Sequence, residues 1–375
     1  MRKLLWIALG LAGTAEANIL EERVFTGSQQ MVPSPFVLNP AANLTSLTLF
    51  AVEHSKRDDN VSFLLNPGQN EAEVKEKISN KDIMLGGQYP LGGASLGAQY
   101  SEQRRTVSAR HINRNEDNNE LFVARDYRVN FCVDFTPQLR GAFTFHHTAI
   151  QADLEGNFFV NDQDRTRYKG TLSGYGLGLN YQLGPLAIGA FSHAPMRGKA
   201  MVEGEQKIVT EPGVYGATFN FRATPVLNVA FNVIRWSYKH DERDDEATSP
   251  AEQQGISLRG VDINQFLRKT MAYGVAGEYG ITPMIFAKAS LTRQEGVFLF
   301  DGDRVPGDSK DAETKVRYNE IRAGVAVKNR AFLAEFGLLM NSAEEGSFRN
   351  NSRFGRMGNY KAKGTGAILA LGGAF

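Results

Sequence analysis

Residues 122–135 read FVARDYRVNFCVDF, and apolar and polar side chains alternate along this stretch. The apolar set occupies every second position: Tyr127, Val129, Phe131, Val133 and Phe135. The positions between them hold Arg128, Asn130, Cys132 and Asp134. Because successive side chains of a strand point to opposite sides, the pattern predicts a β-strand with one apolar and one polar face.

The same period of two recurs in residues 175–183, YGLGLNYQL, and in residues 214–223. Strands of soluble proteins usually run about 5–6 residues, and these segments are longer. Their polar faces are rich in Gly, Asn, Gln and charged residues, which suits a water-filled lumen. The pattern therefore favours a membrane barrel over a soluble sandwich, in which the apolar faces would point inward.

One segment changes phase. In residues 226–239 the apolar positions are first odd-numbered, up to Val233, and then even-numbered, from Ile234. We interpret this as a β-bulge near Ile234 or as an exit from the membrane, beyond which either face can be apolar.

Short turns alternate with long polar segments along the chain. The short turns are at 90–93, 136–138, 184–185, 224–225, 282–283 and 328–330. The long segments are 56–80, 110–120, 153–168, 196–212, 240–269, 300–314 and 343–362. Outer-membrane barrels show this asymmetry, with short periplasmic turns and long extracellular loops.

The turns also give the number of strands. Six short turns join twelve strands, and one strand before them, about 45–55, and one after them, about 363–375, make fourteen. An even number places both chain ends on the short-turn side, as in exported bacterial barrels. The sequence therefore predicts an all-β fold: a 14-stranded antiparallel transmembrane β-barrel with a short N-terminal plug segment.

The composition excludes other classes. The chain has 375 residues, one cysteine, 42 basic and 41 acidic residues, and a mean hydropathy of −0.32. A single cysteine rules out a disulfide scaffold, and a balanced charge gives no bulk reason to bind nucleic acid. The negative mean hydropathy argues against a bundle of membrane helices, each of which needs about 20 mostly apolar residues.

The N-terminus predicts export. Arg2 and Lys3 precede the apolar run 4–12, and Ala15-Glu16-Ala17 is a small-x-small cleavage site, so residues 1–17 are expected to be a signal peptide. The expected domains are then 1–17 as signal peptide, 18–44 as N-terminal plug segment and 45–375 as barrel. The expected location is the bacterial cell outer membrane.

Residues 18–44 are too apolar for a solvated tail, and Pro33, Pro35 and Pro40 prevent a continuous helix. An irregular apolar segment at membrane depth is tolerated only inside the protein. We therefore expect this segment to fold into the barrel. Its backbone would pair with inward groups such as Arg128, Arg140 or Arg322.

The lumen of fourteen strands is too wide to be filled by wall side chains alone. Charged residues of both signs fall on the predicted inner face, and these are the candidate pore-lining residues: Arg128, Asp134, Arg140, Arg222, Glu278, Lys288, Glu320, Arg322 and Glu335. They could order water and set selectivity. The alternative, favoured for any single residue, is a cross-strand ion-pair lattice that stiffens the wall.

Two local motifs carry a family resemblance. The last strand alternates and ends in Phe375, which resembles the terminal aromatic assembly signal of bacterial outer-membrane barrels. Asn39-Pro40-Ala41 ahead of the first strand, and the Thr-Pro turns at 136–137, 224–225 and 282–283, resemble the FadL family of long-chain fatty-acid and hydrocarbon transporters.

The resemblance implies a fourteen-stranded barrel with an N-terminal plug that passively takes up hydrophobic small molecules such as fatty acids. It also implies the barrel-assembly machinery, outer-membrane lipid and lipopolysaccharide as partners, with no nucleic acid. The alternatives are a general diffusion porin and a structural or adhesive barrel.

An outer-membrane hydrolase is the remaining alternative. Its best candidate base is the pair His146-His147, with Thr144, Thr148 or Ser173 as the nearest hydroxyls. No recognised motif surrounds these residues, and a hydrolase needs a nucleophile, a base and an orienting group within mutual reach. We therefore expect no enzyme, no catalytic residue, no cofactor and no metal site.

Overall fold

The computed structural model describes Ala41 and residues 47–64, 72–111, 116–155, 166–202, 205–211, 213–237, 267–300, 312–329, 332–344 and 356–374. The predicted signal peptide, the plug segment apart from Ala41, and the terminal Phe375 lie outside these residues. Ala41 itself lies in a turn and is fully buried.

The regular elements of the described residues are sixteen β-strands. Their bounds are β1 Leu47–Leu64, β2 Ala72–Pro90, β3 Ala94–His111, β4 Glu116–Asp134, β5 Leu139–Glu155, β6 Thr166–Leu183, β7 Leu186–His193, β8 Met196–Val202, β9 Glu205–Glu211, β10 Gly213–Thr224, β11 Leu227–Ser237, β12 Leu267–Gly280, β13 Ile285–Phe300, β14 Ala312–Lys328, β15 Phe332–Glu344 and β16 Arg356–Ala374. Among the described residues no helix is long and apolar enough to cross a membrane.

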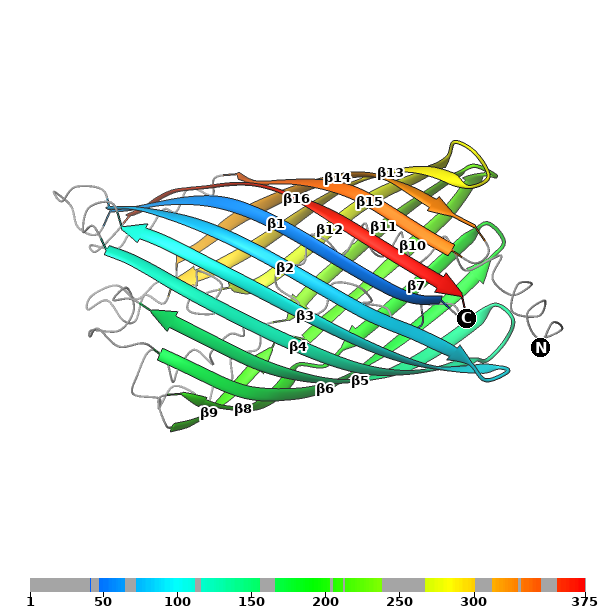
Figure 1. The fold of residues 1–375 in the computed structure, drawn as a ribbon, viewed down its shortest axis with the longest axis horizontal. Helices are drawn as coiled ribbons and strands as arrows, with labels where there is room; N and C mark the ends of the chain where they lie inside the picture. Colours follow the sequence, from blue (N-terminus) through cyan, green and yellow to red (C-terminus); the bar gives the residue numbers. More distant parts are fainter. Residues whose placement is uncertain are drawn as a thin grey trace.

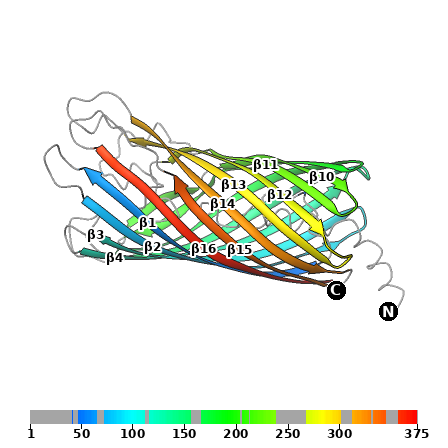
Figure 2. The same ribbon diagram turned by 90° about the horizontal axis from the view of Figure 1, so that it is seen from above.

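These strands form one closed antiparallel wall. Apart from β7 to β10, each strand pairs with its sequence neighbours, and β1 pairs with β16 over almost its whole length, from Leu47↔Ala374 to Leu64↔Arg356. In Figure 1 β16 (red) runs beside β1 (blue), and Figure 2 shows the same tilted strands from above. Closure matters because hydrocarbon offers no partner to an unpaired backbone group.

Two of the fourteen wall strands are interrupted. The strand made of β7 and β8 is broken at Ala194 and Pro195, and β9 and β10 together form its partner: β7 pairs with β10, and β8 with β9. Proline supplies no backbone N–H, so a strand ladder is weakest there. Counting each interrupted pair once gives fourteen strands, and the predicted fold is confirmed.

The alternating residues of the sequence lie alternately on the outer and inner faces of the wall. On β4, Tyr127, Val129 and Phe131 are 47–51% exposed, whereas their neighbours Arg128 and Asn130 are buried. The first set faces outward and the second faces the lumen. An outward apolar belt is what a bilayer requires of a barrel.

Threonine side chains fix the short turns. Thr136 Oγ1 accepts from the backbone N–H groups of Gln138 and Leu139, and Thr282 Oγ1 accepts from those of Met284 and Ile285. The Thr-Pro dipeptides therefore lie at turns, as predicted. The hydroxyls satisfy donors that the reversal of the chain takes out of the ladder.

The predicted long loops were wrong in extent. Residues 56–64 and 72–80 continue β1 and β2, and residues 196–202 and 205–211 form β8 and β9. Strands that rise beyond the bilayer meet water on both sides, so they lose the apolar alternation that marks a spanning segment. Their composition resembles that of a loop although their backbone remains paired.

The predicted bulge near Ile234 was also wrong. The pairing of β10 with β11 runs without a shift from Gly213↔Ser237 to Arg222↔Asn228. Ile234 faces inward and is 2% exposed. The change of phase therefore marks a place where the inner face itself is apolar.

Candidate functional site

Arg322 of β14 holds two carboxylates on the inner face of the wall. Its Nε donates to Glu320 Oε1 at 2.7 Å, and its terminal nitrogens donate to the two oxygens of Glu53 at 3.1 and 3.0 Å. Glu53 belongs to β1, and β15 and β16 lie between β1 and β14. The three side chains are at most 8% exposed. This ion triad ties β14 to the first strand of the barrel across two intervening strands.

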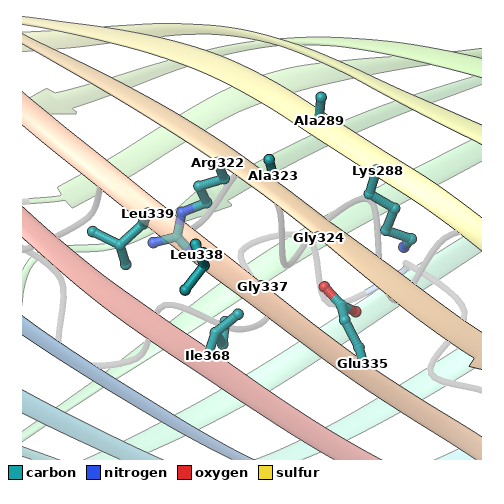
Figure 3. Close-up of a pocket in the computed structure, with 10 residues that line it drawn as sticks. All are labelled: Lys288, Ala289, Arg322, Ala323, Gly324, Glu335, Gly337, Leu338, Leu339 and Ile368. Carbon is teal, nitrogen blue, oxygen red and sulfur yellow. The ribbon is translucent and has the colours of Figure 1, made fainter.

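A second group lies beside the triad. Lys288 Nζ is 2.9 Å from Glu278 Oε2, and the two residues are direct cross-strand neighbours on β13 and β12. Next to Lys288 in the register come Gly324 and Gly337, which have no side chains to fill the inner face. Figure 3 shows Lys288, Glu335 and Arg322 around the space that these glycines leave.

This space is a pocket in the wall. It is lined by Lys288, Ala289, Arg322, Ala323, Gly324, Glu335, Gly337, Leu338, Leu339 and Ile368. The carboxylates of the triad and the pocket are Glu53, Glu278, Glu320 and Glu335, and the cations are Lys288 and Arg322. Among the described side chains this part of the lumen therefore has more carboxyl groups than basic groups.

Another polar cluster lies on β4, β5 and β7. Asp126 Oδ2 accepts from Arg128 Nε at 2.6 Å, and Asp126 Oδ1 accepts from the Thr148 hydroxyl at 2.8 Å. Nδ1 of His146 is 3.9 Å from Asp126 Oδ2, and Nε2 of His146 is 2.9 Å from Nδ1 of His193. The two imidazoles meet edge to face, with ring centroids 4.8 Å apart.

Glycines on β6 make this contact possible. His146 is on β5 and His193 on β7, and β6 lies between them. Gly176 of β6 faces the lumen there, and a Cβ atom at this position would overlap His193 Nδ1 and lie 2.8 Å from Thr144 Cγ2. The ring of His193 therefore occupies the space above Gly176 and reaches across β6.

Part of the remaining inner face is apolar, although Asn232 of β11, which is 3% exposed, lies between Ala230 and Ile234. Phe191 of β7, Val214 of β10, Ile234 of β11 and Ala272 of β12 form one buried cluster, and Ala230 and Ala276 form another on β11 and β12. These strands are neighbours in the wall. The apolar arc lies between the His146–His193 cluster and the Lys288 pocket, so it borders polar groups on both sides.

The predicted pore-lining residues fall into two groups. Six are buried on the inner face: Arg128, Glu278, Lys288, Glu320, Arg322 and Glu335. Three lie near the short turns: Asp134, Arg140 and Arg222, of which Arg140 donates to both oxygens of Asp134. Ion pairs of the kind that the lattice hypothesis requires are thus present, and the role of these residues as a pore lining stays a prediction.

Sequence reasoning missed Glu53, Asp126 and the apolar arc. Asp126 has the same parity as Arg128 in the alternating stretch, so the pattern could have found it. Glu53 could have been found in the same way on the first strand. His193 had no signal, because its contact with His146 depends on a glycine of a third strand.

The two histidines of the hydrolase hypothesis face opposite sides of the wall. His146 is in the lumen, whereas His147 is exposed on the outside, where its Nδ1 is 3.0 Å from Ser173 Oγ. The Thr148 hydroxyl is bound to Asp126 on the inner side. Within the described residues the candidate hydroxyls and bases are therefore not assembled into one nucleophile, base and orienting group.

Comparison with known proteins places the fold. No protein-family model matches the chain, and no curated protein sequence matches it. Solved structures do. A Pseudomonas aeruginosa FadL homologue superposes with a TM-score of 0.58 at 10% identity, covering 96% of this chain and 98% of that one. The fold of this chain is that of the FadL-type barrels.

Two further structures agree with this FadL-like fold. The toluene transporter TodX of P. putida gives a TM-score of 0.55 at 11% identity, covering 90% of this chain and 92% of that one. The toluene transporter TbuX of Ralstonia pickettii gives 0.51 at 11% identity, with the same coverage. The closed wall and its outward apolar belt place the FadL-like barrel in the bacterial outer membrane.

Proposed function

We propose that this barrel carries small hydrophobic molecules across the outer membrane by passive diffusion. The observation that carries the proposal is the apolar arc of Phe191, Val214, Ile234 and Ala272 on the inner face of the barrel. A general porin needs only polar walls, and a buried apolar arc gains nothing from contact with water. The solved structures of similar fold include the toluene transporters TodX and TbuX, which supports the same class of solute.

The charge of the lumen narrows the class of solute. The four carboxylates and two cations around the Lys288 pocket oppose the entry of an anion, because like charges repel strongly where water is scarce. A fatty-acid anion would meet this repulsion, and a neutral hydrocarbon would not. We therefore propose uncharged apolar or aromatic molecules as the preferred solutes, ahead of fatty acids.

The test is uptake into proteoliposomes that contain the purified barrel. Toluene and a long-chain fatty acid are compared as solutes, and ion conductance is measured on planar bilayers with the same preparation. The Ile234→Thr variant shortens the side chain by one methyl group and places a hydroxyl in the apolar arc. We expect toluene uptake to fall about tenfold, since an unpaired hydroxyl in an apolar site costs about 1–3 kcal/mol.

The matched control is Val233→Thr, which changes the neighbouring residue on the outer face, where Val233 is exposed. It should leave uptake unchanged. Equal effects of the two variants would contradict a role for the apolar arc. Large ion conductance without selective uptake of toluene would support the general porin instead.

A further inference from the structure

A basic patch covers the outer surface of four neighbouring strands. On β16, β1, β2 and β3, the described outer side chains above the apolar belt include two carboxylates, Asp58 and Glu102, and seven cations: Lys56, Lys75, Lys77, Lys81, Arg104, Lys361 and Lys363. The strands are adjacent in the wall and lie side by side in Figure 1. The whole chain has nearly equal numbers of basic and acidic residues, so the excess of cations here is local to this surface.

The register shows that the cations form one surface. Asp58 pairs with Lys363 on one side and Lys77 on the other, and His54 pairs with Lys81, which in turn pairs with Arg104. Paired residues on one face of a sheet lie about 4.5–5.5 Å apart between Cβ atoms, so the side chains reach one another. A polyanion lying across these strands would contact several cations at once.

The basic patch stands directly above an apolar surface on the same four strands. Phe50 of β1, Leu85 of β2, Leu96 of β3, and Leu369 and Leu371 of β16 are 40–48% exposed on the outer face. The change from apolar to basic occurs between Val52 and Lys56 on β1, and between Leu85 and Lys81 on β2. An amphiphile with several acyl chains and an anionic head matches both parts.

The outer face of other strands, at a similar height above the apolar belt, does not show this excess of cations. On β13 and β14, Arg293 and Arg317 both lie near Glu295, at 3.3 and 3.4 Å. On β3 and β4, Arg125 is paired with Glu102 at 2.9 Å. In those places one carboxylate accompanies one or two cations, whereas the described outer side chains of the basic patch include seven cations and two carboxylates, Asp58 and Glu102.

We propose that the basic patch is a binding surface for the phosphorylated glycolipid of the outer leaflet, namely the lipid A part of lipopolysaccharide. The phosphates lie on Lys56, Lys81 and Arg104, next to the apolar belt, and Lys75, Lys77, Lys361 and Lys363 meet the anionic sugars above. The acyl chains pack on Phe50, Leu85 and Leu371. Attraction between basic side chains and an anionic lipid surface is additive over several residues and is screened by salt.

The test measures binding of diphosphoryl lipid A, and of the same lipid without phosphates, to the full-length barrel purified in nonionic detergent. We expect the wild-type protein to bind the phosphorylated lipid about tenfold more tightly, with a difference that shrinks as salt rises. Lys56→Gln/Lys81→Gln/Arg104→Gln should lose most of this preference. Equal binding of the two lipids by the wild-type protein would overturn the proposal.

The matched control is Lys169→Gln/Lys199→Gln/Arg235→Gln, which removes two lysines and one arginine that are exposed elsewhere on the barrel. It should retain the preference, and an equal loss in both triple variants would overturn the proposal. Inorganic phosphate should not displace the lipid; displacement would show a site for free anions instead. If the first triple variant fails to assemble, as judged by heat-modifiable gel mobility, Lys81→Gln is compared with Lys169→Gln by the same criteria.

Discussion

At the scale of single residues, glycines determine where the inner face leaves space for a pocket or for a side chain from another strand. Gly324 and Gly337 leave the pocket beside Lys288, and Gly176 gives the ring of His193 its place against His146. A glycine weakens a strand, because it contributes no packing and loses more backbone entropy on folding. Here the ring of His193 occupies the space over Gly176, whereas Gly324 and Gly337 line the pocket.

Replacing Gly176 by alanine tests this account. The new Cβ would overlap His193 and press on Thr144, so the His146–His193 contact must break. We expect the variant to be destabilised by about 1–3 kcal/mol, the usual cost of overpacking. The measurement is the denaturant midpoint of the barrel in lipid vesicles. Gly93→Ala is the control, because nothing lies within 4 Å of a Cβ there; equal shifts in the two midpoints would contradict the account.

At the scale of elements, the hairpins are set by their turns and the wall by its register. The Thr-Pro turns at Thr136 and Thr282 each place a hydroxyl where two backbone donors leave the ladder. The register then continues over long pairs, as in β13 and β14 from Ile285↔Val327 to Phe300↔Ala312. A slip of one residue would exchange the inner and outer faces of a strand, so the apolar belt itself selects the register.

Thr282→Ala removes the acceptor of the N–H groups of Met284 and Ile285. We expect a loss of about 1 kcal/mol, the net worth of an ordinary hydrogen bond. Thr282→Ser keeps the hydroxyl and should unfold close to the wild-type midpoint. A serine variant as unstable as the alanine variant would mean that the methyl group, and not the hydroxyl, matters. Denaturant titration of tyrosine and tryptophan fluorescence gives both midpoints.

At the scale of the whole molecule, closure puts residues that are far apart in the chain into one lumen. The triad of Glu53, Glu320 and Arg322 joins β1 to β14, although nearly 270 residues separate Glu53 from Arg322 (|i−j| = 269). The lumen thus has a charged side, from β12 through β16 to β1, and an apolar arc on β7 and β10–β12. A solute would experience both sides at once, which no single strand reveals.

We propose that the segment 18–44 closes this lumen to ions. Its apolar residues predict a plug, so deletion of residues 18–38 should raise ion conductance severalfold while the barrel still assembles. Planar-bilayer recordings of both forms provide the measurement, and heat-modifiable gel mobility checks assembly. Unchanged conductance would place the segment outside the lumen and favour a general porin with an intrinsic constriction.

The sequence by itself determined the wall. Period-two alternation, as in 122–135, is a local consequence of strand geometry, and proline turns are local too, so the strand number and the inward residues Arg128 and Arg322 were predictable. The strand ends were not, because a strand in water on both sides carries no alternation. This is why residues 56–64 of β1 and 72–80 of β2 resembled loops.

Only the tertiary structure decided which inward residues meet. Arg322 reaches Glu53 because two strands lie between them in the closed wall, and His193 reaches His146 because Gly176 leaves space on β6. In the sequence, Ile234 interrupts the alternating pattern. In the structure it packs with Phe191 and Val214 of neighbouring strands. The basic patch likewise exists only because closure sets β16 beside β1. Contacts across strands depend on register and curvature, and these properties belong to the assembled sheet.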